Sequence, residues 1–192
     1  YKKQGRGGTG SNSTTLIEND YINQLFIGST KEMLLYITNA GKAYWLKIHE
    51  IPEAEKNSRG SNIKGILQVG PDEEITTIVS LKEFSDDQYL FMTTAKGVVK
   101  KVKTSEFTNA KTRGIIGIKL NDGDKLISAV KTSGSSEVMM VSRCGKALRI
   151  NEDTVRTMGR ASCGIKGMKL AEGDEIAAAV EVKEDSNIIL LT

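Results

Sequence analysis

The segment Arg113-Gly114-Ile115-Ile116-Gly117-Ile118-Lys119-Leu120 occurs again about fifty residues later as Cys163-Gly164-Ile165-Lys166-Gly167-Met168-Lys169-Leu170. The two copies share both glycines, the apolar positions and the final lysine. Looser copies begin at Arg59-Gly60 and at Arg6-Gly7. A segment that recurs with a period of this length indicates a repeat protein, in which each repeat is one supersecondary unit.

A second element, an apolar strand that leads into a glycine turn, alternates with these copies. It occurs at 33–42, 89–97 and 138–146, and the strand alone returns at 188–192. The turn glycines supply the positive φ that a short hairpin connection needs. An acidic turn and a further strand follow each complete copy of the first element, so one period contains about four strands.

These strands are short, rich in β-branched residues and bounded by Gly, Asn and Asp, and no apolar stripe has the 3.6-residue period of a helix. Four strands in about fifty residues is the size of a propeller blade. The sequence therefore predicts one all-β domain over 1–192, a propeller-like ring of four-stranded antiparallel blades. About four repeats are visible, at approximately 1–50, 51–105, 106–152 and 153–192.

Composition excludes several classes of function. His49 is the only histidine, and the two cysteines do not form a CxxC pair, which removes the usual zinc sites and histidine-activated nucleophiles. The acidic residues at 122–124 and 172–174 fit turn chemistry better than a calcium loop. No apolar run is long enough to span a membrane. Composition leaves a hydrolase built on carboxylates alone open, but no residue pattern favours one. We therefore expect no catalytic residue, no metal site and no membrane contact.

Charge is sorted along the chain. Residues 96–119 hold seven Lys and Arg against one acid, and residues 143–169 hold seven against two. The acids gather instead at 72–74, 86–87, 174–175 and 184–185. A period in charge that follows the structural period predicts one basic edge, which attracts polyanions.

The segment Gln4-Gly5-Arg6-Gly7-Gly8-Thr9-Gly10 resembles the gyrase-A box, a pattern of glutamine, a basic residue, arginine, two glycines, a basic residue and glycine. Gly5 and Thr9 stand where the pattern has basic residues. The hairpin turns and the segment Ile51-Pro52-Glu53 also resemble that family. The chain is thus similar, over almost all of its length, to the C-terminal domain of the DNA gyrase A subunit.

The resemblance implies a β-pinwheel, a propeller-like ring with exchanged strands that bends and wraps duplex DNA around a basic rim without reading its sequence. It implies a domain that is non-catalytic alone and supports negative supercoiling by an ATP-hydrolysing type IIA topoisomerase. ATP and Mg would belong to other domains, so no cofactor is expected here. The implied partners are double-stranded DNA and, in an A2B2 holoenzyme, the ATPase B subunit together with the rest of the A subunit. The implied location is the cytoplasm, at the bacterial nucleoid.

The predicted DNA contacts are the box and basic residues close to the recurring glycines. Glycines let backbone N–H groups approach phosphate oxygens, and an arginine can bind a phosphate through two hydrogen bonds. The predicted set is Gln4, Arg6, Gly7, Gly8, Gly10, Lys42, Lys100, Lys101, Arg113, Lys146 and Arg149.

Two other interpretations stay open on the sequence. The topoisomerase IV A subunit has the same type of blade with a degenerate or absent box, so the chain could guide DNA for decatenation or relaxation, also within a chimeric type IIA enzyme. A protein-interaction β-propeller is the remote alternative. It would expose aromatic and apolar residues, whereas aromatic residues make up only 5% of this chain.

Overall fold

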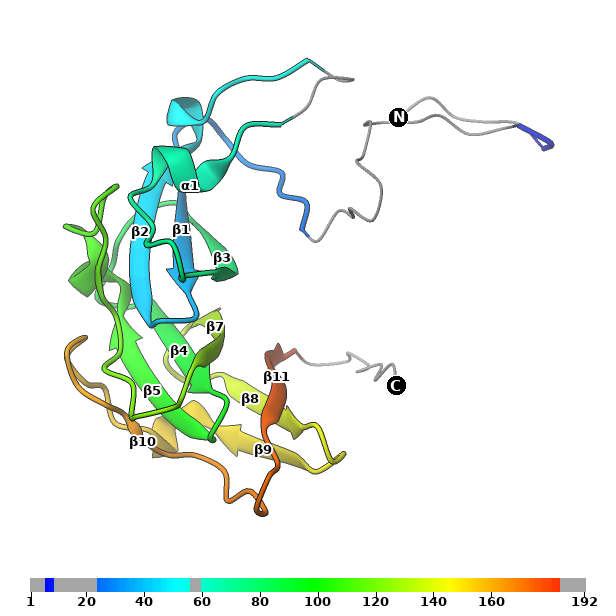
Figure 1. Ribbon diagram of the computed structural model, residues 1–192, viewed down its shortest axis with the longest axis vertical. Coiled ribbons are helices and arrows are strands. Elements are labelled where there is room, and N and C mark those ends of the chain that lie inside the picture. The colour runs from blue at the N-terminus through cyan, green and yellow to red at the C-terminus, as the bar shows by residue number, and fades with distance from the viewer. Residues whose placement is uncertain (1–5, 9–23, 56–59, 184–192) are drawn as a thin grey trace.

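The strands form three antiparallel sheets that follow one another along an arc (Figure 1). The computed structural model describes residues 6–8, 24–55 and 60–183. The first sheet has the order β3 (Ile75–Leu81), β1 (Met33–Thr38), β2 (Lys42–Lys47) and β6 (Ile115–Ile116). The second has the order β7 (Leu126–Thr132), β4 (Tyr89–Thr94), β5 (Val98–Lys103) and β10 (Ile165–Lys166). The third has the order β11 (Ile176–Val182), β8 (Glu137–Ser142) and β9 (Ala147–Asn151).

Helix is confined to four short pieces in the described part of the chain. These are α1 (Ile63–Ile66) and the 3-10 turns η1 (Ile48–Glu50), η2 (Thr104–Phe107) and η3 (Glu152–Thr154). The predicted all-β class with four-stranded antiparallel blades is therefore confirmed. About four repeats were expected and the described residues show three sheets; parts of the first and last expected repeats, at 1–5, 9–23 and 184–192, lie outside them.

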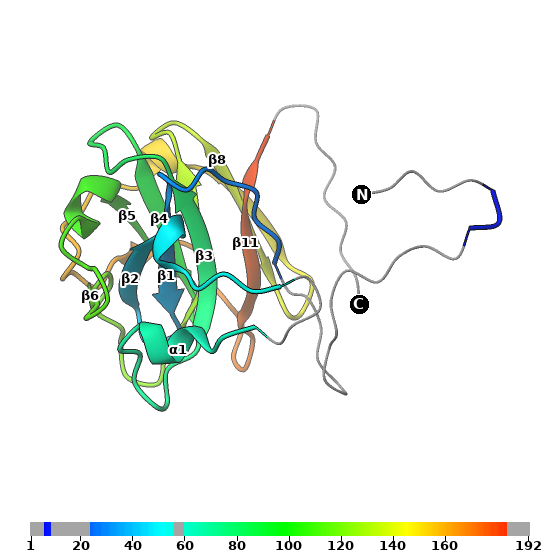
Figure 2. The ribbon, with the colours of Figure 1, turned by 90° about the horizontal axis from the view of Figure 1, so that it is seen from above.

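The outer strand of each complete sheet comes from the following repeat. β6 stands after β4 and β5 in the chain, yet it pairs antiparallel with β2 of the first sheet. β10 likewise follows β8 and β9 but pairs with β5 of the second sheet. These exchanged strands lie on one side of the molecule, and β3 and β11 lie on the other (Figure 2).

Two of the three clusters of buried apolar residues fill the spaces between the sheets, and the third packs on the other face of the first sheet, around Tyr44 and Leu67. Leu90 and Met92 of β4 pack toward the first sheet with Phe107. Phe91, between them in the strand, packs on the other face with Val138 and Met140. Because both faces of the middle sheet are covered, β4 is a continuous apolar run without the alternation typical of a half-exposed strand.

The hairpin glycines hold the exchanged strands. Gly41 and Gly97 have φ of +75° and +79°, which favours glycine in both turns. The carbonyl oxygen of Gly41 accepts hydrogen bonds from the backbone N–H of Gly117 at 2.8 Å and of Ile118 at 3.1 Å. The Gly97 carbonyl does the same for Gly167 and Met168, at 2.9 and 3.1 Å. Each turn thus fixes the next repeat through two backbone hydrogen bonds.

Replacing Gly97 with alanine should destabilise the chain more than replacing Gly145, its equivalent in the third sheet. Both glycines have φ of +79°, so both alanines cost about 1 kcal/mol in backbone strain. A Cβ at position 97 would lie 2.6 Å from the Met168 carbonyl oxygen, whereas at position 145 it meets nothing within 4 Å. We expect Gly97→Ala to lower the free energy of unfolding by roughly 3 kcal/mol, measured by urea denaturation. Equal losses in the two variants would contradict the assigned exchange of strands.

Candidate nucleic-acid interface

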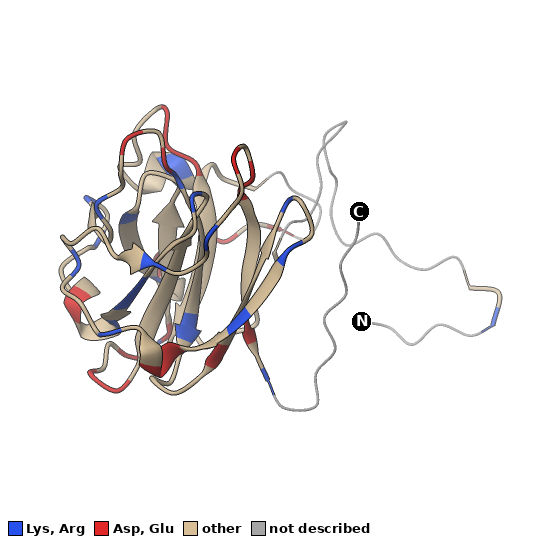
Figure 3. Cartoon of the chain, turned by 90° about the horizontal axis from the view of Figure 1, so that it is seen from below, with Lys and Arg blue, Asp and Glu red and all other residues tan. Residues whose placement is uncertain are grey.

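The exchanged strands β6 and β10 each lie in a segment that is basic and free of acids, and the segment before β3, which contains α1, has the same composition. Three such segments, 56–71, 107–121 and 154–171, together contain ten Lys and Arg residues and no Asp or Glu. Their described parts are called the first (60–71), second (107–121) and third (154–171) rim loops. The second and third rim loops lie on the convex side of the arc (Figure 1). In Figure 3 this side, away from the chain ends, carries several separate Lys and Arg segments.

The cations of the second and third rim loops are available to a ligand. Six of them are exposed and form no ion pair within the described residues: Lys111, Arg113, Lys119, Arg156, Lys166 and Lys169. Arg160 is half-buried, and its Nε lies 4.0 Å from a carboxylate oxygen of Glu106 in η2. A surface with charges of one sign and no internal neutralisation attracts a polyanion.

Backbone hydrogen bonds join the rim loops to one another. The N–H of Gln68 donates to the Thr112 carbonyl at 2.9 Å, which links the first loop to the second. The N–H of Lys119 donates to the Ser162 carbonyl at 3.0 Å, which links the second loop to the third. The exposed cations therefore belong to one connected surface that runs from sheet to sheet.

The second rim loop is also fastened to β2. The backbone N–H of Trp45 donates to the Lys111 carbonyl at 3.1 Å, and the indole Nε1–H donates to the Thr108 carbonyl at 3.0 Å. Lys111 has φ of +35°, the one positive φ at a non-glycine residue in the described chain. Such strained backbone persists only where surrounding contacts determine it, so the position of this loop is set by the fold.

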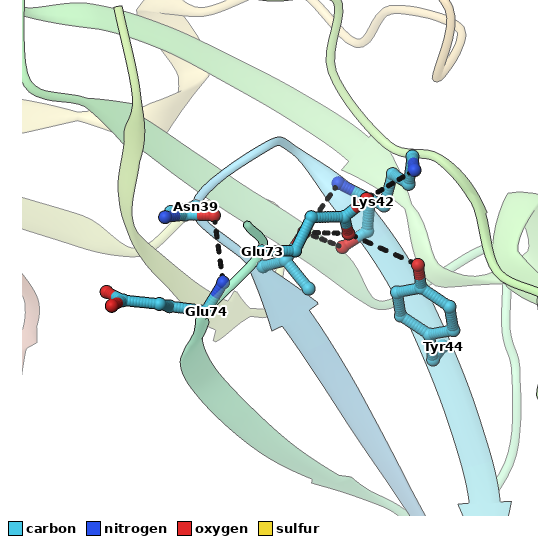
Figure 4. Close-up of polar contacts among 6 residues, drawn as sticks. Asn39, Lys42, Tyr44, Glu73 and Glu74 are labelled. Carbon is cyan, nitrogen blue, oxygen red and sulfur yellow. Dashed lines mark hydrogen bonds and ion pairs between the residues drawn. The ribbon is translucent and has the colours of Figure 1, made fainter. Parts of the chain in front are cut away.

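Of the predicted contacts on the hairpins, Lys42 is already used within the protein. Its Nζ pairs with the carboxylate of Glu73, which also accepts hydrogen bonds from Thr38 and from the Tyr44 hydroxyl (Figure 4). Burial, with the negative charge of Glu73, raises the pKa of Tyr44 to about 12. Lys42 therefore neutralises a buried carboxylate at the base of the first hairpin.

The prediction that Lys100 and Lys101 face DNA is wrong, because both side chains are buried, at 0% and 6% exposure. The Nζ of Lys100 donates to the carbonyls of Gly117, Arg160 and Ser162. The Nζ of Lys101 donates to the Glu152 carbonyl at 3.0 Å and lies 5.3 Å from the centre of the Tyr89 ring. Backbone carbonyls of segments packed against β5 accept from both ammonium groups, so these groups serve the interior.

The remaining predicted contacts fall in three environments. Arg149 is exposed but pairs with Glu137 on the neighbouring strand β8. Lys146 and Arg113 are exposed and form no ion pair within the described residues, Lys146 on the third hairpin and Arg113 in the second rim loop. Within the box, Arg6, Gly7 and Gly8 are exposed and Gly7 has φ of +85°. Gln4 and Gly10 lie outside the described residues.

The predicted set of DNA contacts leaves out five of the six exposed rim cations: Lys111, Lys119, Arg156, Lys166 and Lys169. The signal that could have found them is the absence of acids across each whole segment. For Lys100 the useful signal was its alignment, because it occupies the place that Tyr44 and Leu148 occupy in the other hairpins, counted from the turn glycine. Those neighbours in the alignment are apolar or buried, and Lys100 is buried as well.

The acids after the exchanged strands close turns. A carboxylate oxygen of Asp124 accepts hydrogen bonds from the backbone N–H of Lys96 and Lys125. A carboxylate oxygen of Asp174 likewise accepts hydrogen bonds from the backbone N–H groups of Cys144 and Glu175. The described residues bring no three His, Cys, Asp or Glu side chains together as a metal site. None of the helices in that part of the chain is long and apolar enough to cross a membrane.

Comparison with known families identifies the repeats. The family model of the DNA gyrase C-terminal domain, described as a beta-propeller, matches residues 32–82, 88–133 and 136–183. The gyrase A protein of Treponema pallidum is 54% identical over 162 residues, which cover 84% of this chain and 20% of that protein. That of Salmonella typhimurium is 41% identical over 164 residues, 85% of this chain and 19% of that protein. The chain thus spans about a fifth of these relatives.

Two solved structures share the fold. A DNA gyrase A C-terminal domain aligns with a TM-score of 0.74 and 36% identity, over 96% of this chain and 59% of that one. The C-terminal domain of DNA topoisomerase IV aligns with a TM-score of 0.75 and 30% identity, over 81% of this chain and 48% of that one. The predicted propeller-like pinwheel and the resemblance to the gyrase family are confirmed.

The buried ammonium of Lys100 should give stability a specific dependence on pH. Burial lowers the pKa of Lys100 from 10.5 to about 8. Cys163 and Glu106 act to raise this pKa, and the positive charge of Arg160 lowers it further. Between these values the unfolded chain holds the extra proton, so the free energy of unfolding rises with pH, by up to about 1.4 kcal/mol per pH unit. Urea denaturation from pH 7 to 10 should show this rise in the original chain relative to Lys100→Met.

The nearby thiol is controlled for by Cys163→Ser, which should retain the difference. Parallel pH profiles of the original chain and Lys100→Met would show that the ammonium is not desolvated in the folded state.

Proposed function

The chain belongs to the family of DNA gyrase C-terminal β-propeller domains, and we propose that it binds duplex DNA without sequence specificity and bends it around the rim loops. The observation that carries the proposal is the surface of six exposed cations on the second and third rim loops, which form no ion pair within the described residues. Lys and Arg contacts to phosphates position a duplex but do not read its bases. The rim offers such contacts along two successive sheets.

The shape of the domain supports bending as well as binding. The rim loops follow the convex side of an arc of sheets (Figure 1), so a duplex that contacts both loops has to curve. Bending a short duplex costs several kcal/mol, about 1–6 for a site of two to three turns. Contacts spaced along the arc offset this cost, and backbone bonds between the loops keep the contacts at fixed spacing.

The box is the proposed anchor at the beginning of the wrapped path. Gly7 has φ of +85°, and a Cβ at its position would meet no atom of the described chain within 4 Å, so its backbone is open to a ligand. Arg6 beside it is exposed. Exposed N–H groups next to a guanidinium form a suitable phosphate site.

In its parent protein the domain would act without catalytic residues of its own. Because the relatives are gyrase A proteins, we propose that it works within an A2B2 enzyme, beside the rest of its own A subunit, with an ATPase B subunit as partner. Its part would be to wrap DNA for ATP-dependent negative supercoiling, at the nucleoid in the cytoplasm. ATP and Mg would bind to other domains.

A second candidate is the topoisomerase IV branch, in which the domain would guide DNA for decatenation or relaxation. The observation in its favour is the topoisomerase IV domain, which matches the fold with a TM-score of 0.75, beside 0.74 for the gyrase domain. The sequence identities of 54% and 41% to gyrase A proteins favour the first candidate.

Neutralising the rim should flatten the salt dependence of DNA binding. Replacing Arg113, Lys119, Arg156 and Lys166 with glutamine removes four phosphate contacts, so the slope of log K against log salt should fall by roughly 3 to 4. Fluorescence anisotropy with random-sequence duplexes measures the slope. The matched control replaces the ion-paired Lys42, Arg143 and Arg149, and should change it by less than about 1. A larger effect in the control set would place the duplex on the hairpins.

Altering the box should separate bending from binding. Arg6→Ala combined with Gly7→Ala removes the guanidinium and strains the turn, while the rim cations remain. End-to-end fluorescence transfer across a labelled duplex should therefore lose its bent state, with affinity lowered only about threefold. In the parent enzyme, negative supercoiling should fail while relaxation or decatenation continues. Supercoiling by the altered enzyme at the original rate would contradict the proposed anchor.

A further inference from the structure

The ammonium of Lys100 lies at the joint between the second and third rim loops. Its Nζ donates to the Gly117 carbonyl of the second loop at 2.9 Å and to the Ser162 carbonyl of the third at 3.0 Å. The Arg160 carbonyl is its third acceptor. An ammonium has three N–H donors, and all three are satisfied by carbonyls of the two loops that carry the exposed cations.

The joint between the first and second loops has no such cation among the described residues. There the backbone bond from Gln68 to Thr112 corresponds to the bond from Lys119 to Ser162. The residue in the place of Lys100 is Tyr44, whose hydroxyl donates to Glu73. The joint between the second and third loops is thus built differently from the joint between the first and second, although both have the same backbone hydrogen bond.

Stability alone does not account for a lysine at this position. Burial lowers the pKa of Lys100 to about 8, which means that the folded environment disfavours the charged form. Replacing a buried charge with an apolar side chain of similar volume is often neutral or stabilising. The ammonium does, however, provide what an apolar side chain lacks, since it directs three carbonyls of two loops toward one point.

We propose that Lys100 is a positioning residue for DNA bending, whose ammonium fixes the second and third rim loops relative to each other. The proposal rests on the function proposed above. With the joint fixed, Arg113 and Lys119 on one side and Arg156 and Lys166 on the other present their charges at a constant spacing. A duplex then has to adopt the curvature of the rim, because the rim does not adapt to a straight duplex.

The first test compares Lys100→Met with Lys101→Met, which removes a buried ammonium that is bonded elsewhere. Lys100→Met should speed hydrogen exchange at the Lys119 amide about tenfold and leave the Gln68 amide of the other joint unchanged. It should reduce DNA bending by fluorescence transfer while affinity changes less than about threefold, because the rim cations remain. Lys101→Met should leave bending and both amides as they are.

Chemical rescue distinguishes positioning by the cation from general packing. Lys100→Ala leaves room for n-propylammonium, which restores the missing methylenes and the three N–H donors. It should recover bending in this variant, and tetramethylammonium at equal ionic strength should not, because it has no N–H group. Rescue is measured by the same fluorescence transfer, with the original chain as the reference.

A measurement without substitution at Lys100 covers the case in which the variants do not fold. Raising the pH from 7 to 9 removes the charge of Lys100, so bending by the original chain should decline around pH 8. The charged and titratable groups that face Lys100 are Cys163 and Arg160 from the third rim loop and Glu106 from η2. Cys163→Ser should keep the decline, which excludes the thiol as its source.

The outcomes separate the two proposals. Three outcomes would overturn the positioning role while the proposed function stands. They are bending that survives in Lys100→Met although its joint is loosened, rescue of Lys100→Ala by tetramethylammonium, and bending by the original chain that does not decline up to pH 9. An original chain that binds duplex DNA but does not bend it would overturn both proposals, even where the Lys119 amide responds to Lys100→Met.

Discussion

Two backbone hydrogen bonds to the carbonyl of Gly41 and two to that of Gly97 hold the domain together. Without them β2 and β5 would be exposed edge strands, with unpaired N–H and C=O groups open to unwanted partners. The bonds from Gly117 and Ile118 to Gly41, and from Gly167 and Met168 to Gly97, bring a strand of the next repeat onto that edge. Sheet, turn and following repeat thereby become one unit, and the apolar spaces between sheets close as a consequence.

The same exchange determines where charge is displayed. A chain that must leave one sheet, pair with the preceding one and return passes through a loop on the convex side each time. These loops contain no acid, whereas the acids that follow them, Asp124 and Asp174, are bound to hairpin amides. Lys42 on the first hairpin is used within the protein by Glu73, and Lys100 and Lys101 on β5 by backbone carbonyls. Cations inside the fold and cations on the rim therefore have separate tasks.

Much of this architecture was predictable from the sequence. The repeated glycines and the short β-branched runs predict strands, turns and the period of the blades, because these depend on local backbone preferences. The pairing of Ile115–Ile116 with β2 was not predictable in that way, since a two-residue strand has no periodicity and its partner lies some seventy residues earlier. Lys100 and Lys101 were misassigned because only their distance from a glycine was considered. Their burial depends on contacts with residues far along the chain, such as the carbonyls of Ser162 and Glu152.

Contact between the rim loops and a duplex can be measured as protection of lysines from chemical modification when DNA binds. Amine labelling with mass spectrometry compares Lys111, Lys119, Lys166 and Lys169 on the rim with Lys82, Lys96, Lys125 and Lys131 elsewhere on the exposed surface. We expect random-sequence duplex to protect the first group and to leave the second as reactive as in the free chain. Protection of the second group, with the rim lysines still reactive, would contradict this expectation.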